Sequence, residues 1–124
     1  MSAGSALQAA VADVLAAEAR LTGIYDGPPA RAAFPYAVID AGSESDWGHK
    51  SGEGREVLLA LTVWDEEPAR LGELADAVEA LTGQVFQVDS WRLVSLRLLR
   101  RRTVRDVAGP WATAIDFRAR LLAS

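Results

Sequence analysis

The residue types best suited to catalysis gather around the single histidine of the chain, His49. Ser43, Ser45, Asp46 and Ser51 lie close to it in sequence, and serine, histidine and aspartate are the side chains of a nucleophilic triad. A triad needs rigid neighbours that hold each group in place, whereas this segment is polar and glycine-rich. We therefore expect a solvated loop histidine and no nucleophilic catalysis here.

Two further short patterns have a chemical precedent, a phosphate loop and a metal site. Gly52-Glu53-Gly54 lacks the third glycine of a dinucleotide-binding fingerprint, so a flexible loop or hairpin tip is the better interpretation. Asp65-Glu66-Glu67 has the carboxylates of a metal site, but acids directly before a helix are also explained by the positive end of its dipole. The chain has no cysteine, which excludes disulfides, thiolate catalysis and sulfur-ligated zinc. The sequence predicts no enzyme, no cofactor and no metal.

A dense basic segment lies in the last third of the chain. It contains Arg97, Arg100, Arg101, Arg102 and Arg105. Three consecutive arginines on a strand must point to both of its faces, so at least one points towards whatever covers the neighbouring leucines. Three interpretations stay open: a salt-bridged subunit interface, contact with nucleic acid, and plain solvent exposure.

The charge of the chain is unevenly distributed. The net charge is −4 with an isoelectric point near 4.9, which disfavours a wholly basic nucleic-acid binder. Residues 1–84 carry a net charge of −9 and residues 85–124 a net charge of +5. Opposite poles on a small domain suit head-to-tail or ring association, although a solvated arginine edge would have the same composition.

Length and composition indicate one domain spanning residues 1–124. Half of the 124 residues are hydrophobic, which is enough for a core. The longest apolar run is far shorter than the roughly 18–20 residues of a membrane span. The N-terminal segment lacks the basic start and apolar core of a signal peptide. We expect a soluble protein that is intracellular or embedded in a particle, with no membrane partner.

Two helices and four strands are expected from the spacing of apolar residues. Apolar side chains recur every three or four residues over 5–21 and 68–82, which is typical of amphipathic helices. Ser5, with Gln8 three residues later, has the form of a capping box. Strands are expected over four apolar segments, at 36–41, 55–65, 91–103 and 111–121.

The order helix, strand, strand, helix, strand, strand predicts an α+β fold. We expect an antiparallel, about four-stranded sheet with two helices packed on one face. The strand 57–64 is apolar on both faces apart from Thr62, so it should be central and covered on both sides by the domain or by a neighbouring subunit. The uncovered face of the sheet would expose tryptophan and leucine side chains, which favours oligomerisation.

Alternation also predicts which side chains share a face of the third strand. Its apolar face should be formed by Val94, Leu96 and Leu98. Its polar face should be formed by Ser95, Arg97 and Arg101.

The segment 42–54 is expected to be a long flexible loop that orders only on assembly. It is rich in glycine and serine, which are costly to fix without partner contacts. Trp47 is a large aromatic residue in this polar setting, so we expect it to anchor a partner's pocket. His49 and Lys50 belong to the same expected interface, together with the arginines of the basic segment.

Several short segments, in order along the chain, resemble one family. They are 24–29 (IYDGPP), 34–39 (FPYAVI), 46–48 (DWG), 54–56 (GRE), 61–64 (LTVW), 91–97 (WRLVSLR) and 117–119 (FRA), with Asp106 in the last turn. The chain is similar in these segments to the tail-completion, or tail-terminator, proteins of long-tailed phages and of phage-like gene transfer agents. The turn 106–109 departs from the family by lacking a second acid before its glycine.

The resemblance implies a structural role. Members are small α+β domains that form a hexameric ring, cap the finished tail tube and present a surface to the head-side connector. The implied partners are copies of the chain, the tail tube protein, a connector or stopper protein, and DNA that passes through the channel without sequence-specific binding. The implied location is the head–tail junction of a phage or phage-like particle, assembled in the host cytoplasm. Two alternatives remain: a small nucleic-acid-binding adaptor that uses the strand 97–105, and a small enzyme or ligand-binding domain.

Overall fold

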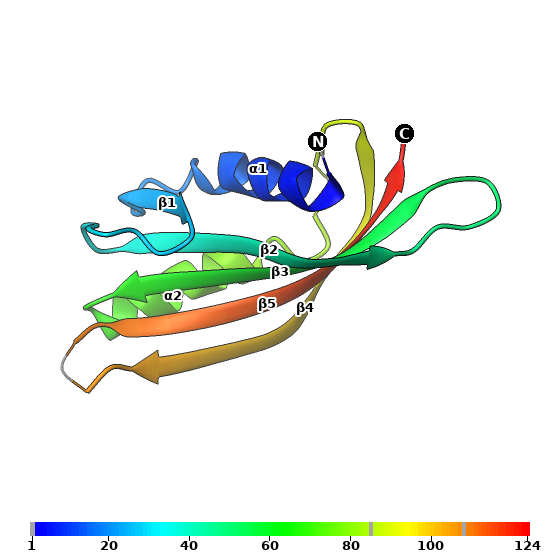
Figure 1. Cartoon of the computed structure of the whole chain (residues 1–124). Helices are drawn as coiled ribbons and strands as arrows, with labels where there is room; N and C mark the ends of the chain where they lie inside the picture. The colour runs from blue at the N-terminus through cyan, green and yellow to red at the C-terminus, as the bar shows by residue number, and fades with distance from the viewer. Residues whose placement is uncertain (1, 85, 108) are drawn as a thin grey trace.

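A computed structural model describes residues 2–84, 86–107 and 109–124 as two helices and a five-stranded sheet (Figure 1). The elements in chain order are α1 (Ala3–Leu15), β1 (Gly23–Asp26), β2 (Tyr36–Asp46), β3 (Gly54–Asp65), α2 (Pro68–Glu79), β4 (Trp91–Arg105) and β5 (Trp111–Ala123). The α+β class is confirmed. Both helices and the strands β2 to β5 lie over the predicted segments. Their ends differ, most of all in β2, which continues to Asp46, and in α1, which stops at Leu15.

The sheet has the strand order β1-β2-β3-β5-β4 and is mixed rather than purely antiparallel. Every neighbouring pair is antiparallel except β1 and β2, which are parallel. The sequence analysis missed β1, because four residues are too short to show alternation. The connection from 27 to 35 returns the chain to the same end of the sheet, which makes the pair parallel. The backbone N–H of Thr22 donates to the carbonyl oxygen of Pro35 at 2.8 Å and holds the start of β1.

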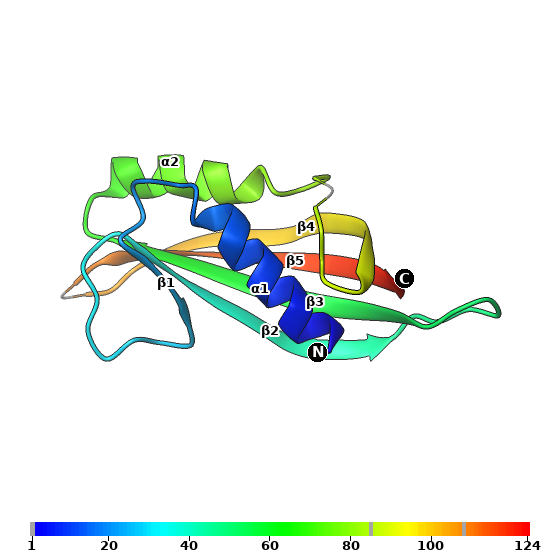
Figure 2. The same ribbon diagram turned by 90° about the horizontal axis from the view of Figure 1, so that it is seen from above.

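Both helices cover the same face of the sheet, as predicted (Figure 2). Helix α1 packs on β2 and β3, and α2 packs on β3 and β5. The core between the layers is formed by alternate residues of the central strands, so Leu61 pairs with Ile115 and Leu59 with Phe117. None of these four side chains is more than 1% exposed. No element of the described chain covers the opposite face of β3, and Leu58 there is 45% exposed.

Helix α1 begins and ends earlier than the sequence indicates. Its N-cap is Ser2, whose hydroxyl oxygen accepts a hydrogen bond from the backbone N–H of Ser5 at 3.2 Å. The expected capping box at Ser5 is therefore wrong. Gln8 instead accepts a hydrogen bond from the backbone N–H of Ala41 at 3.2 Å, which ties the helix to β2. The helix ends at Leu15 rather than at residue 21, and α2 ends at Glu79 rather than at residue 82.

Two β-bulges change the faces of β4. The register with β5 shifts between Leu93 and Ser95 and again between Leu98 and Arg100. An extra residue at each bulge resets the alternation, so the strict pattern predicted for 91–103 is wrong. Val94 is 45% exposed rather than sharing a face with buried Leu96. Beyond the second bulge, Arg101 pairs with buried Ile115 and lies on the helix side of the sheet.

The central strand should carry much of the stability of the fold. Leu61→Ala removes a fully buried side chain and is expected to lower the free energy of unfolding by about 2–5 kcal/mol. Leu58→Ala, on the uncovered face of the same strand, is the matched control and should cost less than about 1 kcal/mol. Chemical denaturation of the two variants measures both changes. Equal losses would show that β3 is not asymmetrically buried.

Candidate assembly interface

The uncovered face of the sheet carries a row of aromatic side chains at its β1–β2–β3 end. Tyr36 stacks on Phe34 with ring centroids 5.6 Å apart and on Trp64 at 6.4 Å, and Tyr25 meets Tyr36 edge to face at 5.8 Å. Because the tyrosine rings are partly buried among these neighbours, loss of solvent raises the pKa of Tyr36. The aromatic row is a rigid, half-exposed apolar surface.

A shallow apolar groove of about 370 Å³ crosses the middle of the same face. Leu58 and Leu99 are 45% and 51% exposed on it, and Ala60 leaves the space between them open. Asp40 and Asp116 line the groove on either side. Adjacent exposed leucines on a sheet without a second layer are typical of a protein interface.

The arginines of the basic segment divide between the two faces of the sheet. Arg101 lies on the helix side, where its guanidinium donates to Asp76 at 2.6 Å and to Glu79 at 2.9 Å. These hydrogen bonds raise the pKa of Arg101, with burial opposing them. The expectation that at least one arginine of the triplet points towards the covering layer is confirmed.

The remaining arginines of the segment are free or weakly held. Arg100 approaches Asp116 at 3.8 Å on the uncovered face. Arg97, Arg102 and Arg105 are exposed and form no ion pair with any residue that the structure describes. The guanidinium of Arg105 lies over the ring of Trp111 at 5.3 Å. Three cations therefore remain available to a partner.

The polar segment 42–54 is the end of a β-hairpin that projects from the body of the molecule (Figure 1). Strand β2 continues to Asp46 and β3 begins at Gly54, so the turn is confined to 47–53. Pairing between β2 and β3 extends into the segment 42–54, so its irregular part is shorter than the glycine content of the segment indicates. The backbone N–H of Trp47 donates to the carbonyl oxygen of Gly54 at 2.9 Å and closes the base of the turn.

Trp47 lies beside β5 rather than free in solvent. The guanidinium of Arg120 lies over its ring at 5.3 Å, and the same arginine approaches Glu56 at 3.4 Å. His49 and Lys50 are exposed at the tip of the turn. The structure thus separates the predicted interface residues into a hairpin group and an arginine group on β4.

The groups around His49 do not have the geometry of a triad. Its Nδ1 atom is 3.3 Å from the hydroxyl of Ser51, in an exposed turn. The carboxylate of Asp46 accepts a hydrogen bond from the backbone N–H of Gly48 at 3.0 Å. Among the described residues, no acid contacts the imidazole. The arrangement therefore lacks the group that orients the histidine of a catalytic triad.

Asp65 forms an ion pair rather than a metal site. Its side chain is fully buried, and its carboxylate receives two hydrogen bonds from Arg70, at 2.6 and 2.7 Å. Burial raises the pKa of Asp65, but the hydrogen bonds from Arg70 and from the backbone of Glu67 outweigh it and leave the pKa below its usual value. In the described ranges, no group of three or more histidine, cysteine or acidic side chains is placed to hold a metal ion.

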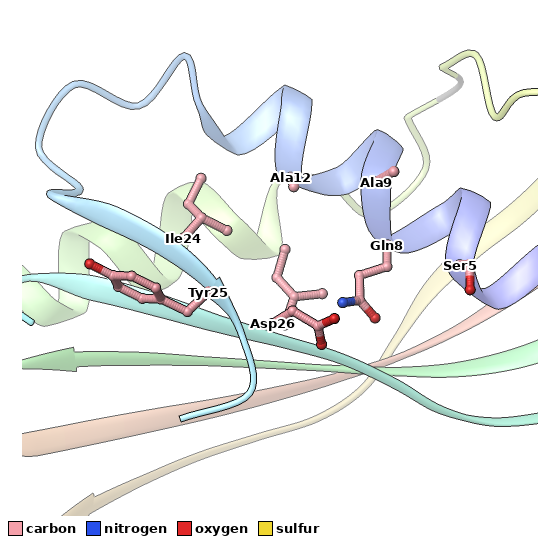
Figure 3. Close-up of a pocket in the computed structure, with 8 residues that line it drawn as sticks. Ser5, Gln8, Ala9, Ala12, Ile24, Tyr25 and Asp26 are labelled. Carbon is pink, nitrogen blue, oxygen red and sulfur yellow. The ribbon is translucent and has the colours of Figure 1, made fainter. Parts of the chain in front are cut away.

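A second groove, of about 330 Å³, lies between α1 and β1 and is not predicted by the sequence analysis (Figure 3). Its α1 wall consists of the small or polar residues Ser5, Gln8, Ala9 and Ala12. Its other wall comes from β1 and β2. Figure 3 shows the carboxylate of Asp26 directed towards the amide of Gln8. The groove depends on β1, so the sequence could reveal it only after that strand was recognised.

Comparison with known families decides the identity of this fold. The model of the family Tail completion protein gp17 matches residues 5–122. The chain belongs to this family. The chain is therefore a structural protein of a phage-like tail, and the resemblance found in the sequence is confirmed.

A solved structure supports the assignment at the level of the fold. The chain is similar to a chain in the virion of a native gene transfer agent particle, with 30% sequence identity and a TM-score of 0.84. The similarity covers 98% of each chain. A search of curated proteins finds no match. In the described part of the chain, neither helix is long and apolar enough to cross a membrane.

Acid pH tests the Asp65–Arg70 ion pair. Because the pKa of Asp65 is lower in the folded than in the unfolded chain, its carboxylate stabilises the fold above the unfolded value of about 3.9. That contribution is lost as the pH falls through the folded pKa. We expect Asp65→Asn to lower the free energy of unfolding by about 1–3 kcal/mol at neutral pH and to flatten its dependence on pH below about 4.

Chemical denaturation at neutral and acid pH measures this difference. Glu66→Gln is the matched control, because the neighbouring Glu66 is exposed and forms no ion pair among the described residues. Its unfolding should follow that of the wild type at each pH. A pH dependence that is the same with and without the Asp65 carboxylate would contradict the assignment.

Proposed function

We propose that this chain forms a ring on the end of the tail tube, stops the growth of the tube and joins it to the head-side connector. The observation that carries this proposal is the uncovered face of the sheet. It combines the aromatic row, the leucine groove and exposed arginines, and nothing within the described chain covers it. A surface of this composition needs a protein partner to remove it from water.

The projecting hairpin supports the same proposal. A protein that joins two assemblies needs surfaces that point in different directions, and the turn 47–53 lies away from the sheet face (Figure 2). We assign the hairpin to a neighbouring tail or connector protein and the sheet to contacts with copies of the same chain. A ring of six copies is what the family resemblance implies.

The unpaired arginines favour a second candidate, a nucleic-acid-binding adaptor. Phosphate contacts need cations on an accessible surface, and Arg97 and Arg102 provide two. However, exposed Leu58, Leu99 and Val104 lie on or beside the same face. Contacts with phosphates do not bury such side chains, so the protein-binding function is favoured. DNA would then pass the ring without being bound by sequence.

Particles made without this chain test the proposed function. If it terminates the tube, its loss should give tubes of uncontrolled length and tails without heads, both visible by electron microscopy. Expression of the wild-type chain in the same cells is the control and should restore attached tails. Tails of normal length with attached heads in its absence would rule the proposal out.

Trp47 should contribute to assembly more than to folding. Trp47→Ala removes a half-exposed ring and its contact with Arg120, a contact worth about 0.5–1 kcal/mol at exposed sites. We expect nearly unchanged melting but fewer particles with attached tails. Arg120→Gln is the comparison variant, because it removes the same contact and leaves the tryptophan in place, and Glu56→Gln controls for the loss of the Arg120–Glu56 ion pair. If Arg120→Gln impairs tail attachment equally, Trp47 acts by holding β5 and not by binding a partner.

A further inference from the structure

Two arginines lie opposite each other on the uncovered face of the sheet without an acid between them. Arg97 of β4 pairs in register with Arg118 of β5. Phe117 and Ala119, on either side of Arg118, are buried on the helix side, so both arginines point the other way. Neither forms an ion pair with a described residue, and the buried Nε atom of Arg118 has no hydrogen-bond partner there. Like charges directly opposite each other destabilise a sheet, so an anion from another molecule would stabilise the Arg97–Arg118 pair.

The leucine groove lies directly beside the Arg97–Arg118 pair. Leu58 of β3 is the cross-strand neighbour of Arg118, and Leu58 and Leu99 line the groove. Cross-strand neighbours are about 5 Å apart, and consecutive residues of a chain are about 3.8 Å apart at Cα. One short segment can therefore place an apolar side chain in the groove and a carboxylate on the arginine pair. The surface fits a segment in which an acid stands next to a large apolar residue.

The carboxylates of the groove set the orientation of such a segment. Asp40 and Asp116 line it, but Asp116 lies opposite Arg100, at 3.8 Å. Asp40 lies on β2, and β3 separates it from Arg118. The side of the groove towards β4 therefore has an unbalanced positive charge, and the side towards β2 has a negative charge. An occupant must direct its acid towards β4.

The turn between β4 and β5 has the required composition in Asp106 and Val107, which we call the β4–β5 tip. Five large apolar side chains of the described chain are at least 45% exposed: Leu58, Val94, Leu99, Val104 and Val107. Of these, Val107 alone stands next to an acid, and its exposure, 101%, is the highest. Asp106 forms no ion pair with a described residue, and its backbone N–H donates to the carbonyl oxygen of Pro110 at 3.2 Å. The turn thus presents an unpaired acid and an uncovered valine together.

The β4–β5 tip cannot reach the groove of its own molecule. The stretch of β4 from Leu99 to Arg105 spans about 20 Å of extended strand and leads away from the groove. The tip also lies at the opposite end of the sheet from the hairpin turn 47–53 (Figure 1). A contact through the tip therefore joins two molecules and leaves that hairpin free.

We propose that copies of this chain associate head to tail, with the β4–β5 tip of one copy seated on the uncovered face of the next. Val107 occupies the leucine groove, and the carboxylate of Asp106 binds the Arg97–Arg118 pair. The inference rests on the proposed ring and names a contact that would build it. The contact is heterologous, so each copy uses its tip and its sheet face once, and the contact can repeat around a ring.

Charge decides between the leucine groove and the two grooves beside α1. Asp26 lines the groove between α1 and β1, and Glu18 lines a groove of about 200 Å³ between α1 and α2. Neither has an arginine among its lining residues, so Asp106 would meet a like charge there. A second copy is also favoured over DNA. Phosphates could reach the arginine pair, but DNA would leave both the groove and Val107 uncovered.

Charge reversal on either side of the contact tests the proposal. The tip variant is Asp106→Arg, and the face variant combines Arg97→Glu with Arg118→Glu. Each should raise the dissociation constant for self-association about tenfold or more, because like charges then meet. Light scattering up to millimolar concentration measures association, and thermal melting shows that each variant is folded. A wild-type chain that stays monomeric over this range would overturn the proposal.

Mixing the tip variant with the face variant gives the decisive result. Every contact between unlike copies then joins opposite charges, so the mixture should associate although neither variant does so alone. The matched controls are Asp13→Arg for the tip variant and Arg31→Glu with Arg92→Glu for the face variant. These residues are exposed, form no ion pair with a described residue and lie outside the proposed contact. Failure of the mixture, or equal weakening by the controls, would overturn the proposal.

Val107→Thr tests the apolar half of the contact without changing any charge. It places a hydroxyl in the leucine groove and should weaken association about fivefold or more. Melting of the single chain should not change, because the side chain is fully exposed there. Val94→Thr, at an exposed valine outside the groove, is the control and should associate as the wild type does. Equal association of both variants would show that Val107 does not enter the groove.

Two further readouts separate this inference from its alternatives. If the face variant loses binding to a short DNA duplex while its self-association is unchanged, the arginines bind phosphate and the proposal is wrong. If particles with the tip variant assemble normally while particles without the chain do not, the terminator function stands and this contact falls. If particles without the chain also assemble normally, the proposed function itself fails.

Discussion

Two helices, of 13 and 12 residues, cover one face of a five-stranded sheet, and no described element covers the other face. The position of the core and the exposed surfaces of the molecule follow from this one-sided covering. Strand β3 lies in the middle of the sheet and touches both helices, so its inward residues form the core. Its outward residues include Leu58 and Trp64, which would be buried in a protein with a second layer. The helix side of the sheet is therefore buried, and the other side exposes apolar side chains of the kind that protein partners cover.

The distribution of arginines follows from the same asymmetry. A bulge in β4 turns Arg101 to the helix side, where two acids of α2 neutralise it. Its neighbour Arg102 faces the bare side and has no described acid within reach. An unpaired charge in water destabilises the fold very little. Its attraction to an opposite charge becomes stronger when a partner excludes water from the pair. The bulge therefore decides which arginine pairs with acids of α2 and which stays exposed on the uncovered face.

Long periodic segments made most of the fold predictable from the sequence. The amphipathic pattern of 68–82 and the apolar run at 57–64 depend only on side-chain spacing, and both elements appear where that spacing puts them. Bulges leave no such trace, because an inserted residue changes the register without changing composition, and this is why Arg101 was assigned to the wrong face. Strand β1 and its groove were missed for a different reason. Their four residues pair only because the chain returns along β2, which is a long-range event.

The candidate interface was predictable in its residue types and not in its geometry. Charge counts alone showed that the two parts of the chain have opposite sign, and Trp47 stood out in a polar segment. Only the strand order shows that free charges of opposite sign occupy opposite edges, since β1 comes early in the chain and β4 late. Trp47 also gains a neighbour, Arg120, that lies more than 70 residues away in sequence.

The composition of the two edge strands explains how the protein avoids pairing with unrelated strands. An exposed, flat and apolar edge pairs with any other strand and leads to aggregation. Here β1 is only four residues long, and the end of β4 carries free arginines, so two β4 edges repel each other. The same features keep the edges selective, because a strand of four residues offers few free backbone groups and an edge that carries arginines favours a partner that supplies acids.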